Sequence, residues 1–224
     1  MNQTVDLDGL TKATRRREFD DGLMDFAVGA GYLVLGILAW FLFSPGGLRW
    51  YAIALLKNRT LTLFGLASLA VLILVGARGA RRAIDRIRAS TTWRVSGFVK
   101  PLRMQAGWPT MVLSGVVTLG IIIGASWFMA IGRLGAENAL RTLVASSGIA
   151  TGIVYFGMGV AVGLRRYLAV GLAGGILSAV ILFMPLSFSV AWLVLGTIWI
   201  IVLGVSGAWA LRLTLSANVD SSSE

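Results

Sequence analysis

A series of long apolar runs, each bounded by charged residues, proline or tryptophan, constrains this chain more than any other feature. A helix needs about 20 consecutive apolar residues to cross the hydrocarbon core of a bilayer. Six runs meet this requirement, and they predict membrane-spanning helices at residues 22–43, 60–78, 108–131, 144–164, 167–185 and 189–211. The expected fold is therefore an all-α integral membrane protein, a bundle of six transmembrane helices.

The composition supports a lipid environment and argues against an enzyme. Hydrophobic residues make up 57% of the chain and charged residues 13%, whereas an ordinary soluble domain has roughly 25% charged residues. Cysteine and histidine are both absent, which removes disulfides, thiolate nucleophiles and the usual zinc and haem ligands. We predict a non-enzymatic protein with no catalytic residues and no cofactor.

The basic residues predict the orientation of the chain. Six spans place both termini on one side, and 15 of the 20 Lys and Arg residues then lie on that side. Because cytoplasmic loops carry the excess of Lys and Arg, both termini are expected in the cytoplasm. The predicted parts are an N-terminal cytoplasmic segment at 1–21, a transmembrane domain at 22–211 and a cytoplasmic tail at 212–224.

The connections between the spans differ in length. The segment 48–56 is apolar but too short to span, so we expect an interfacial turn or short helix there. The loop at 79–107 is long and basic, and we expect it to extend the second helix before it lies along the headgroups. Anionic lipid is its expected partner, a protein partner is the alternative, and nucleic acid is not expected. The residues predicted to make this contact are Arg81, Arg82, Arg86 and Arg88.

Glycines spaced four apart predict where helices pack. In a bilayer, helices associate through close contact of small residues, because lipid tails are as apolar as leucine. Four such pairs predict packing within the chain or between copies: Gly120 with Gly124, Gly148 with Gly152, Gly159 with Gly163, and Gly171 with Gly175. Glycine hinges at a substrate site are the alternative interpretation.

Three acids at the start of the first span are the candidate functional site. Glu18, Asp21 and Asp25 would share one face of a continuous helix, since they are spaced by three and then four. The simplest interpretation is that Asp20 or Asp21 caps the helix. Asp25 would then be hydrated or paired with an arginine of the 78–103 loop, with Arg165 or with Arg166.

Two functional interpretations of these acids stay open beside the structural one. A carboxylate in a medium of low dielectric loses its hydration, so Asp25 could carry a proton or bind a cation. An oxygen site for Mg²⁺ or Ca²⁺ built on Glu18, Asp21 and Asp25 is also conceivable, although acids beside Arg15, Arg16 and Arg17 more often form local ion pairs.

The stretch "REFDDGLMDFAVGAGYLVLGI" resembles the opening of a group of uncharacterised bacterial multi-span membrane proteins. Members carry a "DGL" motif followed by an aspartate and a glycine-spaced span, and later a "YPRxGYV"-like element in a cytoplasmic loop. Here "TWRVSGFVK" (92–100) stands at that place, with Arg94 and Val95 instead of the Pro-Arg pair. The resemblance implies a bacterial cytoplasmic membrane location, brings no catalytic residues, and suggests that "DGL" and "GFVK" meet at the inner surface.

Two functions follow as hypotheses. The leading one is an accessory, assembly or regulatory membrane protein that acts through its basic cytoplasmic face, with another membrane protein or a second copy of the chain as its partner. The second is a small proton- or ion-coupled transporter or channel subunit that uses Asp25. An intramembrane enzyme ranks third, because the spans assemble no nucleophile with a base.

Overall fold

The computed structural model describes residues 21–90 and 135–221, together with seven single positions (112, 115, 116, 119, 120, 123 and 124). Every regular element in this part of the chain is a helix. In chain order the elements are α2 (Leu23–Phe43), α3 (Pro45–Lys57), α4 (Arg59–Ser90), α7 (Ala136–Val162), α8 (Arg165–Val180), the short 3₁₀ helix η1 (Ile181–Phe183) and α9 (Phe188–Ser221).

Five of these helical segments are long and apolar enough to cross a membrane: α2, α4, α7, α8 continued by η1, and α9. They coincide with five of the six predicted spans, so the prediction of an all-helical fold is confirmed in the described residues. The remaining span, predicted at 108–131, falls on a stretch where only the seven single positions are described, all of them helical.

Several helices run beyond the apolar segments that predicted them. At 1.5 Å per residue, the 32 residues of α4 measure about 48 Å, which exceeds the hydrocarbon thickness of about 30 Å. Its continuation to Ser90 confirms the predicted extension of the second helix. α9 also continues past residue 211 to Ser221, so the start of the predicted tail is helical.

A short helix joins α2 to α4, as expected for the segment at 48–56. Ser44 separates α2 from α3, and its hydroxyl oxygen accepts a hydrogen bond from the backbone N–H of Gly47. Pro45 occupies the first turn, where its missing N–H costs nothing. Asn58 alone separates α3 from α4, and its side chain accepts from the N–H of Leu61.

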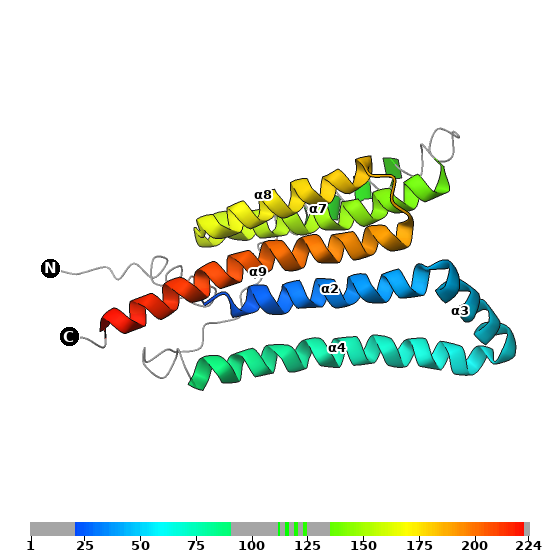
Figure 1. Cartoon of the computed structure of the whole chain (residues 1–224), viewed down its shortest axis with the longest axis horizontal. Coiled ribbons are helices and arrows are strands. Elements are labelled where there is room, and N and C mark those ends of the chain that lie inside the picture. The colour runs from blue at the N-terminus through cyan, green and yellow to red at the C-terminus, as the bar shows by residue number, and fades with distance from the viewer. Residues whose placement is uncertain are drawn as a thin grey trace.

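The described helices form two antiparallel pairs and an outer helix. α2 lies along α9, and α7 lies along α8 (Figure 1), while α9 also contacts α7 and α8. Trp199, Leu195 and Leu203 of α9 are fully buried and form the centre of the core. α2 begins and α9 ends at the end of the bundle where α7 turns into α8 (Figure 1).

Glycines allow α2 and α9 to approach closely. A Cβ atom added to Gly36 would lie 2.7 Å from the carbonyl oxygen of Trp192, and one added to Gly196 would lie 2.7 Å from that of Tyr32. Real Cβ atoms do not approach backbone so closely, so only glycine fits. Gly29 is similarly close to Ile200.

The glycines predicted to pack α7 on α8 divide into two groups. Gly148, Gly152, Gly159 and Gly171 confirm the prediction, because an added Cβ at each would lie less than 3 Å from a residue of α8 or α7. A Cβ added to Gly175 would lie 3.8 Å from Cα of Gly152, which is an ordinary van der Waals distance.

Three predicted packing glycines behave differently. Gly163 ends α7 in the left-handed conformation (φ 74°), so its function is to cap the helix and turn the chain. A Cβ added to Gly120 or Gly124 would meet nothing within 4 Å among the described residues, so for these two the packing stays a prediction.

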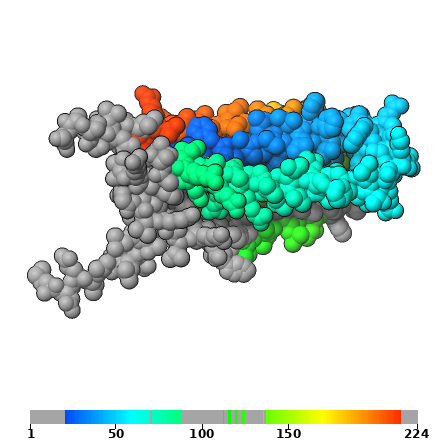
Figure 2. Space-filling model, turned by 90° about the horizontal axis from the view of Figure 1, so that it is seen from below, coloured from blue at the N-terminus to red at the C-terminus, as the bar shows by residue number. Residues whose placement is uncertain are grey.

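α4 lies at the edge of the bundle beside α2 and contacts it through a narrow face (Figure 2). The half-buried residues Thr62, Leu66, Leu69 and Ile73 recur at helical spacing along this face. Most of the other described side chains in the span are exposed, and none in its most apolar window is buried. The outer surface of α4 is therefore an apolar face without a helical neighbour in the described residues.

Candidate functional site: a buried carboxylate that joins three helices

The "DGL" motif forms the start of α2. Gly22 precedes the helix in the left-handed conformation (φ 69°), and an added Cβ would lie 2.4 Å from the carbonyl oxygen of Gly207. Oδ1 of Asp21 accepts a hydrogen bond from the N–H of Leu23 at 3.1 Å. Asp21 therefore satisfies one of the unpaired N–H groups of the first turn, which confirms its predicted capping role.

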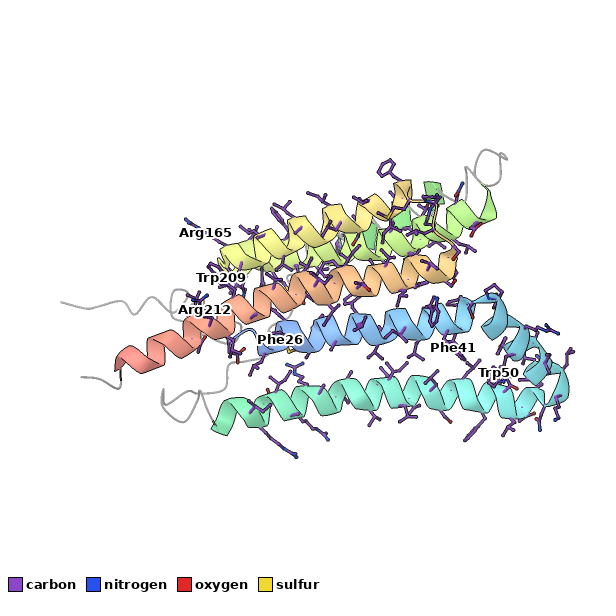
Figure 3. All side chains as sticks on the ribbon, in the orientation of Figure 1. Phe26, Phe41, Trp50, Arg165, Trp209 and Arg212 are labelled. Atoms are coloured by element: carbon purple, nitrogen blue, oxygen red, sulfur yellow. The ribbon has the colours of Figure 1, made fainter. Side chains whose placement is uncertain are left out.

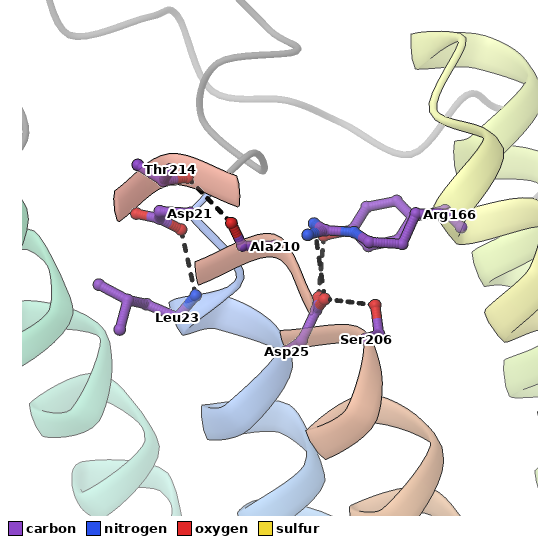
Figure 4. A network of polar contacts seen from close by, with 8 residues as sticks. Asp21, Leu23, Asp25, Arg166, Ser206, Ala210 and Thr214 are labelled. Atoms are coloured by element: carbon purple, nitrogen blue, oxygen red, sulfur yellow. Dashed lines mark hydrogen bonds and ion pairs between the residues drawn. The ribbon is translucent and has the colours of Figure 1, made fainter. Parts of the chain in front are cut away.

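Asp25 lies one turn further along and is 1% exposed. Its Oδ1 accepts a hydrogen bond from the hydroxyl of Tyr167 at 3.0 Å, and its Oδ2 accepts one from the hydroxyl of Ser206 at 2.9 Å (Figure 4). Nη2 of Arg166 lies 3.5 Å from Oδ2 and completes an ion pair. Asp25 comes from α2, Arg166 and Tyr167 from α8, and Ser206 from α9, so one carboxylate links three helices.

The turn between α7 and α8 places the two α8 residues. After Gly163 the chain passes through Leu164, and α8 begins at Arg165. The guanidinium carbon of Arg166 lies 5.0 Å from the ring centroid of Tyr167, a geometry that favours cation–π attraction. The arginine and the tyrosine therefore contact each other as well as the carboxylate.

These contacts decide between the sequence-based alternatives for Asp25. The predicted pairing with an arginine is confirmed for Arg166, and the predicted hydration does not apply to a carboxylate that is 1% exposed. The prediction that Asp21 and Asp25 share a continuous helix is wrong, because the left-handed Gly22 interrupts the helix between them. Glu18 and the "GFVK" element lie outside the described residues.

A metal site at the acids finds no support in the geometry. Among the residues that the structure describes, no group of three acids lies close enough to hold an ion. Both oxygens of Asp25 already accept hydrogen bonds from protein hydroxyls.

The predicted contact arginines lie elsewhere, at the far end of α4 from α3. Arg81, Arg82 and Arg86 are exposed there, and Arg88 belongs to the same helix. Within the described residues, they are not part of the contacts around Asp25.

A buried series of aromatic rings leads from the carboxylate into the core. Tyr167 contacts Tyr155 edge to face at 5.5 Å, Tyr155 stacks on Trp199 at 5.7 Å, and Trp199 stacks on Tyr32 at 5.4 Å, all between centroids. The hydroxyl of Tyr32 is hydrogen-bonded to that of Thr151. Sequence reasoning missed this series, although a tyrosine or tryptophan inside an apolar run is itself a signal that a polar partner is near.

No protein-family model matches the chain, and searches of curated proteins and of solved structures find no match either. The class of the protein therefore follows from the described residues alone. They are all-helical and include five helices suited to crossing a membrane, as expected of a multi-pass membrane protein. Polar side chains link α2, α8 and α9 at one end of its bundle.

Proposed function

We propose that this chain is a non-enzymatic, multi-pass accessory protein of the bacterial cytoplasmic membrane. In this proposal it holds a second membrane protein against α4 and thereby assists the assembly or regulation of that partner. The observation that carries the proposal is the exposure of α4. A helix of 32 residues contacts the bundle through one narrow face and leaves its apolar outer surface open.

The side chains on the outer surface of α4 are large as well as exposed. Phe64 is 70% exposed and Leu72 is 67% exposed, and further exposed residues of the same span are Leu61, Leu63, Val71, Leu74 and Val75. A contiguous apolar surface of this kind serves either lipid contact or protein contact. In this proposal the arginines at the end of the helix, which anionic lipid would also attract, contact a protein.

The end of α4 carries exposed arginines at helical spacing. Arg78, Arg82 and Arg86 are four residues apart and lie along one side of the helix, with Arg81 beside them. A partner with a matching apolar helix and acidic residues at its cytoplasmic margin would complement both features of α4. Charge complementarity of this kind fixes the register and the choice of partner.

Co-purification in a mild detergent tests the proposal. The tagged wild-type chain should retain a membrane protein that is lost when Arg81, Arg82, Arg86 and Arg88 are all replaced by Gln. The control replaces three basic residues, Arg49, Lys57 and Arg59, by Gln, since these residues lie at the opposite end of α4 or on α3. This control should keep the partner.

Two outcomes count against this function. A wild-type chain that purifies alone from its native membrane would contradict it. Loss of the partner from both sets of variants would mean that the total charge, and not the arginines at the end of α4, mediates the contact.

A second candidate is a proton- or ion-coupled transporter in which Asp25 is the ionisable group. It is favoured by the ion pair between Asp25 and Arg166, because charged side chains within spans often mark transport pathways. Liposomes that contain the wild-type chain should then show uptake that Asp25→Asn abolishes. Equal uptake by the two proteins, or no uptake by either, would exclude this role.

A further inference from the structure

A groove lies at the end of the bundle where α7 turns into α8. Its volume is about 750 Å³, and its lining includes Leu164, Arg165 and Arg166 from the turn and from α8, with Trp209, Leu213 and Thr214 from α9. Arg165 and Trp209 are labelled at this end of the molecule in Figure 3. None of the described residues that line the groove is acidic, and Asp21 lies nearby, beside Ala210 and Thr214 (Figure 4).

The charged side chains among the described lining residues are both arginines. Asp25 balances the charge of Arg166, while the exposed side chain of Arg165 adds a second positive charge to the lining. The two arginines also open α8, so the positive end of a 16-residue helix is directed towards the same place. Guanidinium groups bind phosphate in a bidentate manner. The groove therefore has the chemistry of a phosphate site.

Two apolar side chains of the lining are accessible. Trp209 is 66% exposed and Leu213 is 57% exposed. Tryptophan is enriched at the level of the lipid headgroups, where its ring is amphipathic. A free phosphate ion would not contact these apolar side chains favourably, whereas a phospholipid presents a phosphate and an acyl chain side by side.

We propose that this groove binds one anionic phospholipid. Arg165, assisted by Arg166, contacts the phosphate, and Trp209 and Leu213 contact the glycerol backbone and the first methylenes of the acyl chains. The site is separate from the arginines of α4, and it does not depend on the proposed partner. Because Arg166 also pairs with Asp25, the bound lipid would lie next to the link between α2, α8 and α9.

Native mass spectrometry of the purified full chain in detergent tests the proposal. Phosphatidylglycerol and phosphatidylcholine are added in separate titrations, and the fraction of protein with one bound lipid is measured. We expect the wild-type chain to prefer phosphatidylglycerol. One basic residue near the surface contributes about 1 kcal/mol, so Arg165→Gln should weaken this binding about fivefold.

Two further variants control for charge and for folding. Arg212→Gln removes the same charge from an exposed position that does not line the groove, and it should change binding less than twofold. Arg165→Lys keeps the charge but loses the bidentate contact, so its affinity should lie between those of the wild type and Arg165→Gln, which separates a binding defect from misfolding.

Three results would overturn the lipid site. The first is equal binding of phosphatidylglycerol and phosphatidylcholine. The second is an equal loss of binding in Arg165→Gln and Arg212→Gln. The third is displacement of phosphatidylglycerol by inorganic phosphate at equal concentration, because the groove would then recognise the free ion.

Discussion

Tyr167 donates a hydrogen bond to Oδ1 of Asp25 at 3.0 Å, although the two residues are 142 positions apart in the chain. The contact joins the start of α8 to the start of α2, and Ser206 of α9 completes the link through the other oxygen. A carboxylate with these partners holds three helices in register. The stability of the bundle should therefore depend on each partner by a different amount.

Removing the carboxylate should cost more than removing either hydroxyl. Ser206→Ala and Tyr167→Phe each delete one interhelical hydrogen bond, worth about 0.6–1.7 kcal/mol in a membrane protein. Asp25→Ala also removes the counter-ion of a partly buried arginine, so its cost should approach about 3 kcal/mol. Reversible unfolding in mixed micelles, followed by circular dichroism, measures the three free energies. An Asp25→Ala chain as stable as the wild type would contradict the linking role.

Asp25 and Arg166 should be energetically coupled. Their side chains form an ion pair at 3.5 Å, so the loss of one partner removes most of what the other contributes. The double variant Asp25→Asn with Arg166→Gln should be less destabilised than the sum of the two single variants, by at least about 0.5 kcal/mol. A cycle of four unfolding measurements gives this value, and strict additivity would mean that the two side chains act independently.

The contact between α2 and α9 should tolerate only glycine at its closest points. Gly36→Ala would place a Cβ 2.7 Å from the carbonyl oxygen of Trp192, and forcing the helices apart should cost about 1–3 kcal/mol. Gly31→Ala is the matched control on the same helix, because its Cβ meets nothing within 4 Å. It should leave the melting temperature in detergent unchanged or slightly raised. Equal effects at the two positions would refute the close approach.

The α7–α8 hairpin offers a comparison of two glycines that face each other. A Cβ at Gly152 would lie 2.7 Å from the carbonyl oxygen of Gly171, whereas one at Gly175 would lie 3.8 Å from the nearest atom. Gly152→Ala should therefore lower the melting temperature by several degrees, and Gly175→Ala should not. The spacing pattern alone treats them alike, so the comparison tests the structure and not the motif.

Sequence patterns predicted the described spans because hydropathy over 20 residues is a strong signal. They predicted the helix ends less well, since α4 and α9 continue through polar residues that favour helix but add nothing to the apolar count. The packing role of two glycines of α2 was not predicted for a related reason. Gly29 and Gly36 are seven residues apart, which returns to the same helix face after nearly two turns, whereas the packing pattern predicted from the sequence has a spacing of four.

The candidate site was predicted only in part. Charge alone suggested Arg166 as one of several partners for Asp25, because few charged groups lie near the ends of the spans. Tyr167 and Ser206 could not be assigned, since hydroxyls within an apolar run can bond to their own helix backbone. Only the three-dimensional arrangement shows which of these hydroxyls contact the carboxylate.

The orientation of the chain can be tested with single cysteines, because the natural sequence contains none. Asn58→Cys lies between α3 and α4, at the opposite end of the bundle from Arg212→Cys on α9 (Figure 1). The uneven distribution of Lys and Arg predicts that an impermeant maleimide labels residue 58 in intact cells and residue 212 only after permeabilisation. The reverse pattern would invert the topology.

The pairing of α2 with α9 has a consequence for biogenesis. Asp25 leaves the ribosome 181 residues before Ser206, so α2 is made long before the hydroxyl that donates to its carboxylate and before the glycines of α9. If the helices insert into a bilayer in chain order, that carboxylate needs temporary partners, such as headgroups or an insertion factor, until α9 follows. The α7–α8 hairpin has no such delay. Truncated nascent chains should therefore contain a folded hairpin and an unattached first helix, which the cell's quality-control proteases would recognise.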